Sequence, residues 1–295
     1  MILGVFIKTI HQRKLFNYNL SVFKTLKFTL FTNNSRGLST YNYLKKRGIN
    51  INKIFISKKN FDKKIFNELK RKKLKINIIK NLQERNVFEI LKKTDLALVC
   101  GFPLIFRKKH LKFTKYGFLN QHAGTLPMYR GGSPLNWQII NDEKYFGISV
   151  IKINEKIDEG DIVVEKKFKL LKKYKIEHLH KIANKNFGNL TLRAISKLIK
   201  NVKLKKQTKN DAKYFKQRNI KDSCFIPNKT SYKNLILLDR AVSKSYPRPY
   251  FKINSKKIII NNFKKITKKI KMKKNYSKKF NKKYLKLRDS IIEFR

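Results

Sequence analysis

Acidic residues are scarce in this chain: 18 Asp and Glu stand against 73 Lys and Arg among 295 residues, which gives a formal net charge of +55. Such a charge is typical of proteins that bind phosphate-bearing partners, either nucleic acids or anionic membrane surfaces. It also arises when a genome rich in A and T raises Lys, Ile, Asn, Phe and Tyr together, and all five types are abundant here. The charge alone therefore identifies no partner.

Cysteine and long apolar runs are also rare. Cys100 and Cys224 lie far apart in the sequence, which argues against a disulfide framework and a metal site and favours a reducing compartment. No apolar run approaches the roughly 18 residues that a membrane span needs. Residues 1–26 carry basic residues and no acid, a pattern typical of an organellar targeting segment and equally of an early start codon. We therefore expect no membrane association and no metal, and a cytoplasmic location or, with a targeting segment, an organellar matrix.

Strand-like and helix-like segments alternate over residues 27–205. Such alternation predicts an α/β domain with a Rossmann-like, mostly parallel sheet and helices on both faces. The apolar runs predict strands, and the segments with apolar residues at helical spacing predict helices. The expected strands are 26–34, 51–59, 95–106, 117–122, 147–153 and 161–168, and the expected helices are 35–48, 61–75 and 176–202.

The pattern changes in residues 206–295, which we expect to form a small β-rich domain. A short helix follows Thr230 and Ser231, either of which can cap it. Strand-like runs then flank a turn at Asn254 and Ser255. No acidic residue occurs in 240–288, and the last stretch, 264–295, predicts a strand edge followed by a loose basic tail.

One stretch, "LNQHAGTLPMYRGGSPLNWQ" (119–138), holds three of the 11 glycines, two of the six prolines and the only tryptophan. Asn120 and His122 are two apart at the end of an expected strand, so their side chains share a face. Asp158 lies in the polar loop "IDEGD" between two further expected strands. An amide, an imidazole and a carboxylate together suit acyl transfer to an amine, with Asn120 donating to an oxyanion and His122 supplying a proton.

These motifs resemble the folate-dependent formyltransferases. The likeness rests on "NQHAGTLPMYRGGSPLNWQIIND" followed by "GISVIKINEKIDEGDIV". It implies transfer of a formyl group from 10-formyltetrahydrofolate to a substrate amine, with Asn120, His122 and Asp158 as the catalytic set. It also implies an open-barrel (OB-like) C-terminal domain, and places the folate against Pro103, Leu104, Ile105, Gly124, Thr125, Leu126, Pro127 and Asn154. This chain has Gly124-Thr125 where the family usually has Ser-Leu.

The acceptor amine has two candidates within this resemblance. The run "SPLNWQIINDE" is similar to that of sugar-nucleotide formyltransferases, and the basic loop that methionyl-tRNA formyltransferases carry after the second strand is missing. Both features favour a nucleotide-linked amino sugar, which is the acceptor that we expect. The basic C-terminal region makes initiator methionyl-tRNA the alternative. Arg130 and Trp137 are candidate substrate contacts, although a lone tryptophan is also common in a core. A basic RNA-binding protein without enzymatic activity is the third possibility.

Overall fold

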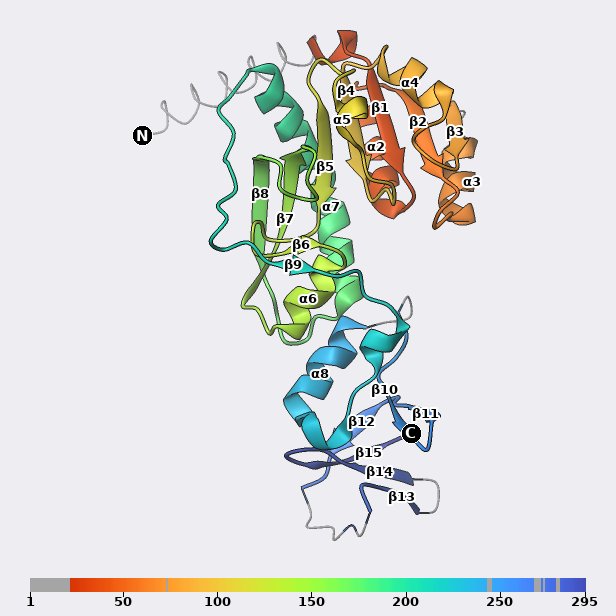
Figure 1. The fold of residues 1–295 in the computed structure, drawn as a ribbon, viewed down its shortest axis with the longest axis vertical. Helices are drawn as coiled ribbons and strands as arrows, with labels where there is room; N and C mark the ends of the chain where they lie inside the picture. Colours follow the sequence, from red (N-terminus) through yellow and green to blue (C-terminus); the bar gives the residue numbers. More distant parts are fainter. Residues whose placement is uncertain (1–21, 73, 243–245, 268–271, 273, 280–281) are drawn as a thin grey trace. The chain divides into compact units, whose positions relative to one another are not determined.

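The computed structural model describes residues 22–72, 74–242, 246–267, 272, 274–279 and 282–295. The chain divides into two compact units (Figure 1). The first takes in Met1–Arg130, Gly147–Lys166 and Ile182–Ala212, and the second takes in Gly131–Phe146, Lys167–Lys181 and Lys213–Arg295. Most of the predicted N-terminal extension, residues 1–21, lies outside the described residues.

A seven-stranded sheet, in the order β3-β2-β1-β4-β5-β7-β8, forms the framework of the first unit. The β1, β2, β3, β4 and β5 strands pair in parallel, whereas β7 runs antiparallel to β5. The prediction of a mostly parallel α/β sheet is therefore confirmed. The strands are β1 (Phe28–Thr32), β2 (Ile51–Ser57), β3 (Ile76–Ile79), β4 (Leu96–Cys100), β5 (Phe118–His122), β7 (Tyr145–Lys152) and β8 (Ile162–Lys169).

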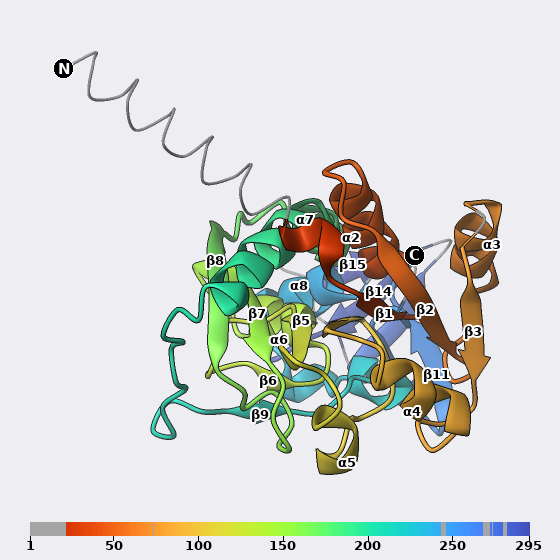
Figure 2. The ribbon, with the colours of Figure 1, turned by 90° about the horizontal axis from the view of Figure 1, so that it is seen from above.

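Helices cover both faces of this sheet, with α2 and α7 on one face and α4 and α5 on the other (Figure 2). Asn34 caps α2 and Asp62 caps α3, each through a side-chain oxygen that accepts from backbone N–H groups of the first turn. A Cβ on Gly188 of α7 would lie 2.4 Å from Cβ of Tyr43 in α2, so glycine lets these two helices pack closely. The helices are α2 (Ser35–Lys45), α3 (Lys63–Arg71), α4 (Arg85–Leu91), α5 (Lys108–Leu111) and α7 (Ile176–Ile199).

Phenylalanine rings dominate the core between the sheet and α4. The ring of Phe31 stacks on Phe55 at 4.8 Å and meets Phe106 edge-on at 4.9 Å. Phe31 and Phe55 are fully buried on neighbouring strands. Burial on both faces explains why the central strands read as continuous apolar runs rather than alternating ones.

The second unit combines α6 (Pro134–Ile140) and α8 (Tyr232–Ala241) with two antiparallel sheets. Ser231 caps α8 by accepting from the Asn234 N–H at 3.1 Å, one of the two capping residues that the sequence offered. Asn254 and Ser255 form the predicted turn, which joins β10 to β11. One sheet pairs β10 (Tyr250–Ile253) with β11 (Lys256–Ile259), and the other contains β12 (Phe263–Lys265), β15 (Ile291–Phe294), β14 (Lys282–Lys286) and β13 (Tyr276–Lys279) in that order. The OB-like form of this region stays a prediction.

The expectation of a loose basic tail is wrong for the described residues. Strands β14 and β15 pair over four positions, and Leu285, Ile292 and Phe294 are buried in the core of the second unit. In β14 the buried Leu285 is followed by the exposed Lys286, and in β15 the buried Ile292 and Phe294 alternate with the half-buried Ile291 and Glu293. One face of each strand is therefore buried. The high lysine content masked this alternation in the sequence.

The described fold also includes the short strand pair of β6 (Arg130–Gly131) with β9 (Tyr214–Phe215), and two 3-10 turns at Ile220–Ser223 and Pro227–Lys229. A Cβ on Gly131, which has a φ of +88°, would lie 2.2 Å from the Phe215 carbonyl oxygen, so this pairing requires glycine. Among the described helices none is both long and apolar enough to cross a membrane.

Candidate active site

Asn120 and His122 occupy the carboxyl end of β5, where the strand leaves the sheet. Their side chains lie on one face, and that of Gln121 lies on the other because strand residues alternate. The amide of Gln121 donates to Thr40 of α2 and to Thr191 of α7, both at 2.7 Å. These two bonds fix the register of the strand end and hence the direction in which Asn120 and His122 point.

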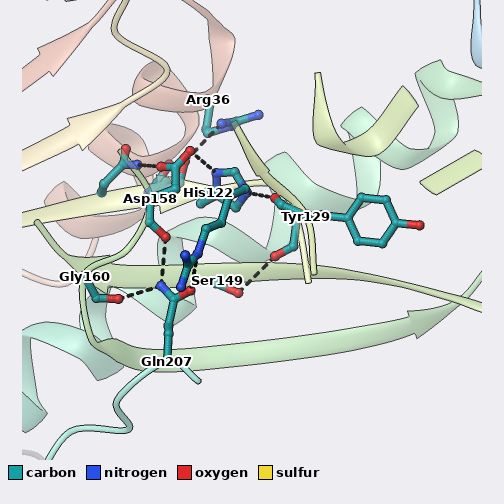
Figure 3. A network of polar contacts seen from close by, with 11 residues as sticks. Arg36, His122, Tyr129, Ser149, Asp158, Gly160 and Gln207 are labelled. Carbon is teal, nitrogen blue, oxygen red and sulfur yellow. Dashed lines mark hydrogen bonds and ion pairs between the residues drawn. The ribbon is translucent and has the colours of Figure 1, made fainter. Parts of the chain in front are cut away.

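Asp158 reaches these two side chains from the loop between β7 and β8. Its Oδ1 accepts from Nδ2 of Asn120 at 3.3 Å, and its Oδ2 lies 3.4 Å from Nδ1 of His122. The His122 side chain is 5% exposed and that of Asp158 12%, so water screens their interaction weakly. The structure thus brings the three predicted catalytic side chains together (Figure 3).

The imidazole of His122 has a polar partner on each nitrogen. Nε2 contacts the Tyr129 carbonyl oxygen at 2.5 Å, and Nδ1 faces the Asp158 carboxylate. Carbonyl and carboxylate oxygens only accept hydrogen bonds, so a ring that donates in both contacts carries a proton on each nitrogen. His122 is thus held by a polar contact on each side of its ring.

The Asp158 turn has an unusual backbone. Asp158 itself has a φ of +53°, in the left-handed region that residues other than glycine, asparagine and aspartate rarely adopt. A Cβ on Gly160 would lie 1.7 Å from the carbonyl oxygen of Lys152, so no larger residue fits there. The loop therefore needs both residue types to bring the carboxylate back over β5.

Gln207 holds the same turn from the segment that follows α7. Its Nε2 donates to the carbonyl oxygens of Asp158 at 2.8 Å and Gly160 at 2.7 Å, as Figure 3 shows. Its Oε1 accepts from Nε of Arg130 at 3.0 Å, and Nη1 of Arg130 lies 3.3 Å from Oε1 of Glu159. Sequence reasoning missed Gln207, because no motif links it to a turn so distant along the chain.

A cavity of about 180 Å³ opens beside the three side chains, and Asn120 and Asp158 form part of its wall. The rest of the lining is mostly apolar and comes from the ends of β4 and β7 and from the loops that follow these two strands. Site formation at the carboxyl ends of strands is the rule for open α/β sheets. The apolar members are Val99, Phe102, Leu104, Ile105, Phe106, Ile151, Ile153 and Ile157.

The sequence of this chain also matches a known protein family. A family model described as formyl transferase matches residues 44–195, just over half of the chain. This chain belongs to the formyl transferase family. The resemblance noted in the sequence to folate-dependent formyltransferases is therefore confirmed.

Two proteins with similar sequences illustrate the range of the family. This chain is 32% identical over 173 residues to the methionyl-tRNA formyltransferase of Wolbachia pipientis subsp. Culex pipiens, a match that covers 57% of this chain and 54% of that protein. It is also 32% identical over 208 residues to the bifunctional polymyxin resistance protein ArnA of Wigglesworthia glossinidia brevipalpis, covering 68% of this chain and 31% of that protein. The chain thus spans about half the length, or less, of the curated relatives it matches.

A solved structure with a similar fold is the N-formyltransferase from Helicobacter canadensis in complex with folinic acid and dTDP-3-aminofucose. The TM-score is 0.69 at 18% sequence identity, and the match covers 92% of this chain and 99% of that chain. At this level of identity the likeness shows that the two proteins share a fold.

The folate contacts implied by the family resemblance fall into two groups. Leu104, Ile105 and Asn154 line the cavity. Gly124, Thr125, Leu126 and Pro127 are not among its lining residues and form a packed loop that includes a cis peptide bond before Pro127. Ser149 of β7 anchors this loop by donating to the Gly124 carbonyl oxygen at 3.0 Å. Pro103 lies next to the cavity residues in sequence without lining the cavity itself.

The two residues proposed from the sequence as substrate contacts have other partners. Arg130 is only 4% exposed and contacts Glu159 and Gln207. Trp137, within the second unit, donates from Nε1 to the Lys216 carbonyl oxygen at 3.0 Å, and its ring lies 5.4 Å from that of Phe215. A substrate role for either residue stays a prediction.

Arg36 and Cys100 also lie near the strand ends but are not among the three predicted catalytic side chains. Arg36, at the start of α2, donates from Nη1 to the Gln121 carbonyl oxygen at 3.2 Å and adds a cation beside the cluster (Figure 3). Burial raises the pKa of the Cys100 thiol to about 12, so this cysteine at the end of β4 stays protonated and unreactive.

No group of three or more His, Cys, Asp and Glu suited to a metal ion occurs among the described residues.

Proposed function

We propose that this protein transfers a formyl group from 10-formyltetrahydrofolate to a substrate amine. The observation that carries the proposal is the convergence of Asn120, His122 and Asp158 beside an apolar cavity, with both carboxylate oxygens of Asp158 turned towards the other two side chains. An amide donor, an imidazolium and a carboxylate supply what formyl transfer between two nitrogens requires.

Each side chain has a distinct role in this scheme. As the amine attacks the formyl carbon, Asn120 donates its amide N–H to the oxygen that becomes negatively charged. Asp158 accepts the proton that the attacking amine loses. His122 gives a proton to the nitrogen that departs, and the neighbouring carboxylate stabilises the charged ring until then. The attacking nucleophile belongs to the substrate, so no covalent bond to the protein forms.

The cavity fits the ring end of a folate better than the whole molecule. Its volume of about 180 Å³ is below the ~300–1,000 Å³ of most small-molecule sites. Leu104 and Ile153 offer apolar walls for a flat heterocycle, and Asn154 and Asp158 offer polar groups at its edge. The folate supplies the formyl group; Leu104, Ile105 and Asn154 would hold its ring.

For the acceptor we propose the amino group of methionyl-tRNA. The sequence relatives named methionyl-tRNA formyltransferase, at 30–35% identity, support this choice. A hollow of about 740 Å³ in the second unit supports it as well, since five cations and one tyrosine ring lie among its lining residues, together with isoleucines and asparagines. The cations and the ring belong to Lys256, Lys257, Lys278, Lys283, Arg295 and Tyr276. Basic grooves with an aromatic side chain suit a phosphate backbone with stacked bases.

The pairing of these lysines gives a further reason. Lys278 and Lys283, which both line the hollow, stand directly opposite each other on β13 and β14. Lys257 of the lining stands opposite Lys252, which lies outside it, on β11 and β10. Like charges at opposed positions of an antiparallel pair are unfavourable. A bound polyanion would relieve this repulsion.

A nucleotide-linked amino sugar is the second candidate acceptor. The observation that favours it is the short connection from β2 to α3, which takes only residues 58–62 and leaves no room for the basic loop of the tRNA-formylating enzymes. The other sequence feature in its favour, "PLNW", has an internal explanation. Asn136 donates to the Ala241 carbonyl oxygen at 2.6 Å, and Trp137 packs on Phe215, so the motif serves contacts within the second unit.

A direct assay separates the candidates. The full chain is incubated with 10-formyltetrahydrofolate and either initiator tRNA charged with methionine or amino-sugar nucleotides, and products are identified by mass spectrometry. We expect formylation of the methionyl amine by the wild type and none by His122→Asn. Formylation of the sugar alone would overturn the proposed acceptor, and transfer to neither would overturn formyl transfer itself.

A further inference from the structure

The segment after α7 is attached to the edge of the sheet before it reaches the catalytic turn. Lys205 pairs with Ile162 of β8 through two backbone hydrogen bonds of 2.8 and 3.2 Å. Nζ of Lys205 also lies 3.0 Å from Oε1 of Glu165 on the same strand. The backbone leading to Gln207 is therefore fixed on the sheet, so that its side chain starts from a defined position.

The contacts of Arg130 determine which way the Gln207 amide faces. A guanidinium only donates hydrogen bonds, so the Gln207 atom 3.0 Å from Nε of Arg130 is the oxygen. Both N–H bonds then point to the carbonyl oxygens of Asp158 and Gly160. Arg130 is itself held by Glu159, which belongs to the same turn. The three bonds of Gln207 and the ion pair close a ring of contacts around Asp158.

This ring surrounds a backbone conformation that is unfavourable on its own. A non-glycine residue with a φ of +53° persists where neighbouring contacts hold it. The Asp158 side chain takes its direction from that backbone, and small displacements of a catalytic group lower the rate of reaction strongly. The carbonyl oxygens on both sides of Glu159 are the points at which Gln207 holds the turn.

We propose that Gln207 is a positioning residue: it holds the Asp158 turn so that the carboxylate faces Asn120 and His122, and Arg130 orients its amide. The effect of Gln207 on the reaction presupposes the formyl transfer proposed above. Gln207 touches neither of the two reacting molecules in this scheme. It acts through Asp158, and this route distinguishes it from a residue that only stabilises the fold.

The test is a double-mutant cycle with Gln207→Met, which keeps the length of the side chain and removes its hydrogen bonds, and Asp158→Asn. We expect Gln207→Met to lower kcat for formyl transfer by roughly 10- to 100-fold in the wild-type background and by less than about twofold in the Asp158→Asn background. Equal losses in both backgrounds would show that Gln207 does not act through Asp158 and would overturn the proposal.

A second variant and a second measurement cover a failure of Gln207→Met to fold. Gln207→Glu keeps the contact with Arg130 and removes both N–H donors, so it should lose activity as the methionine variant does. Hydrogen exchange of the amides in residues 156–161 should accelerate in either variant, whereas Gln83→Met, on an exposed turn of the first unit, should leave both exchange and activity unchanged. Wild-type exchange rates in the Gln207→Glu variant would overturn the proposal.

The exchange measurement is independent of the reaction. If the wild type transfers no formyl group to any acceptor while exchange of the turn depends on Gln207, the proposed function fails and the restraint on the turn remains. If the wild type is active and both Gln207 variants match it, the positioning role fails and the proposed function remains.

Discussion

Oδ2 of Asp158 lies 3.4 Å from Nδ1 of His122, although the two residues leave different strands of the sheet. The antiparallel pairing of β5 with β7 sets His122 opposite Ser149 and Leu119 opposite Lys152, so β7 ends beside the start of β5. The loop after β7 then folds back along β5 and brings Asp158 to His122. The left-handed backbone at Asp158 then turns the carboxylate towards the ring. The relationship ties the catalytic proposal to a specific turn, and the turn can be altered without touching the imidazole.

The first prediction concerns Gly160. Replacing it with alanine places a Cβ 1.7 Å from the Lys152 carbonyl oxygen, so the turn has to move and carry Asp158 with it. We expect formyl transfer to fall by at least roughly tenfold, measured as kcat under saturating substrates. Gly48→Ala is the matched control. It strains a φ of +73° where the added Cβ meets only the Lys24 side chain, at 3.5 Å, and should lower stability by about 1 kcal/mol without affecting the rate. Equal activity in the two variants would contradict the role given to the turn.

The second prediction concerns the basic hollow of the second unit. Lys278→Glu with Lys283→Glu should raise KM for methionyl-tRNA by about tenfold or more at low salt and reduce the salt dependence of binding. A control pair, Lys181→Glu with Lys185→Glu on exposed positions of α7, changes the net charge equally. If both pairs weaken binding alike, the total charge of the chain and not this hollow attracts the RNA.

A third prediction links pH to stability through His110. Burial lowers the pKa of this histidine below its ordinary value of 6.5, and the ring lies between the Leu82 and Arg107 backbones in a fully buried position. The unfolded chain takes up the proton first as pH falls, so the stability contributed by neutral His110 is complete above pH 6.5 and is lost below it. The free energy of unfolding, measured in urea, should therefore differ less between the wild type and His110→Gln at pH 5.5 than at pH 7.5. An advantage that grows on acidification would contradict the assignment.

The two cysteines should differ sharply in reactivity, which is the fourth prediction. Cys100 is fully buried with its pKa raised to about 12, whereas Cys224 is exposed. A disulfide reagent at pH 8 should modify one thiol in the native wild type and none in Cys224→Ser, and denaturant should release the second. Rapid reaction of two thiols in the native protein would show that the end of β4 opens to solvent.

Much of the first unit could be predicted from the sequence because its signals are local. The apolar run 96–100 follows from burial on both faces of β4, and the alternation of side chains along β5 puts Asn120 and His122 on one face. Asp158 was identified by a loop motif and a family resemblance. The second unit was harder to predict, since the lysines of β14 hid its alternation of buried and exposed positions.

The role of Gln207 could not be predicted, and the reason is physical. Its bonds to Asp158 and Gly160 depend on where α7 ends and on how the following segment pairs with β8. No periodicity encodes a side chain that meets a backbone carbonyl from a distant part of the sequence. The same holds for Arg130, whose position in a Gly-rich loop favoured a substrate contact while its guanidinium contacts Glu159 and Gln207.

The most direct measurement is the single-turnover rate of formyl transfer from 10-formyltetrahydrofolate by Asp158→Asn. Asparagine tolerates the left-handed backbone of this position, so the variant removes the negative charge and keeps the turn. We predict a fall of roughly 100-fold or more, with folate binding and thermal stability close to those of the wild type. A rate within about twofold of the wild type would show that the carboxylate beside His122 takes no part in the reaction.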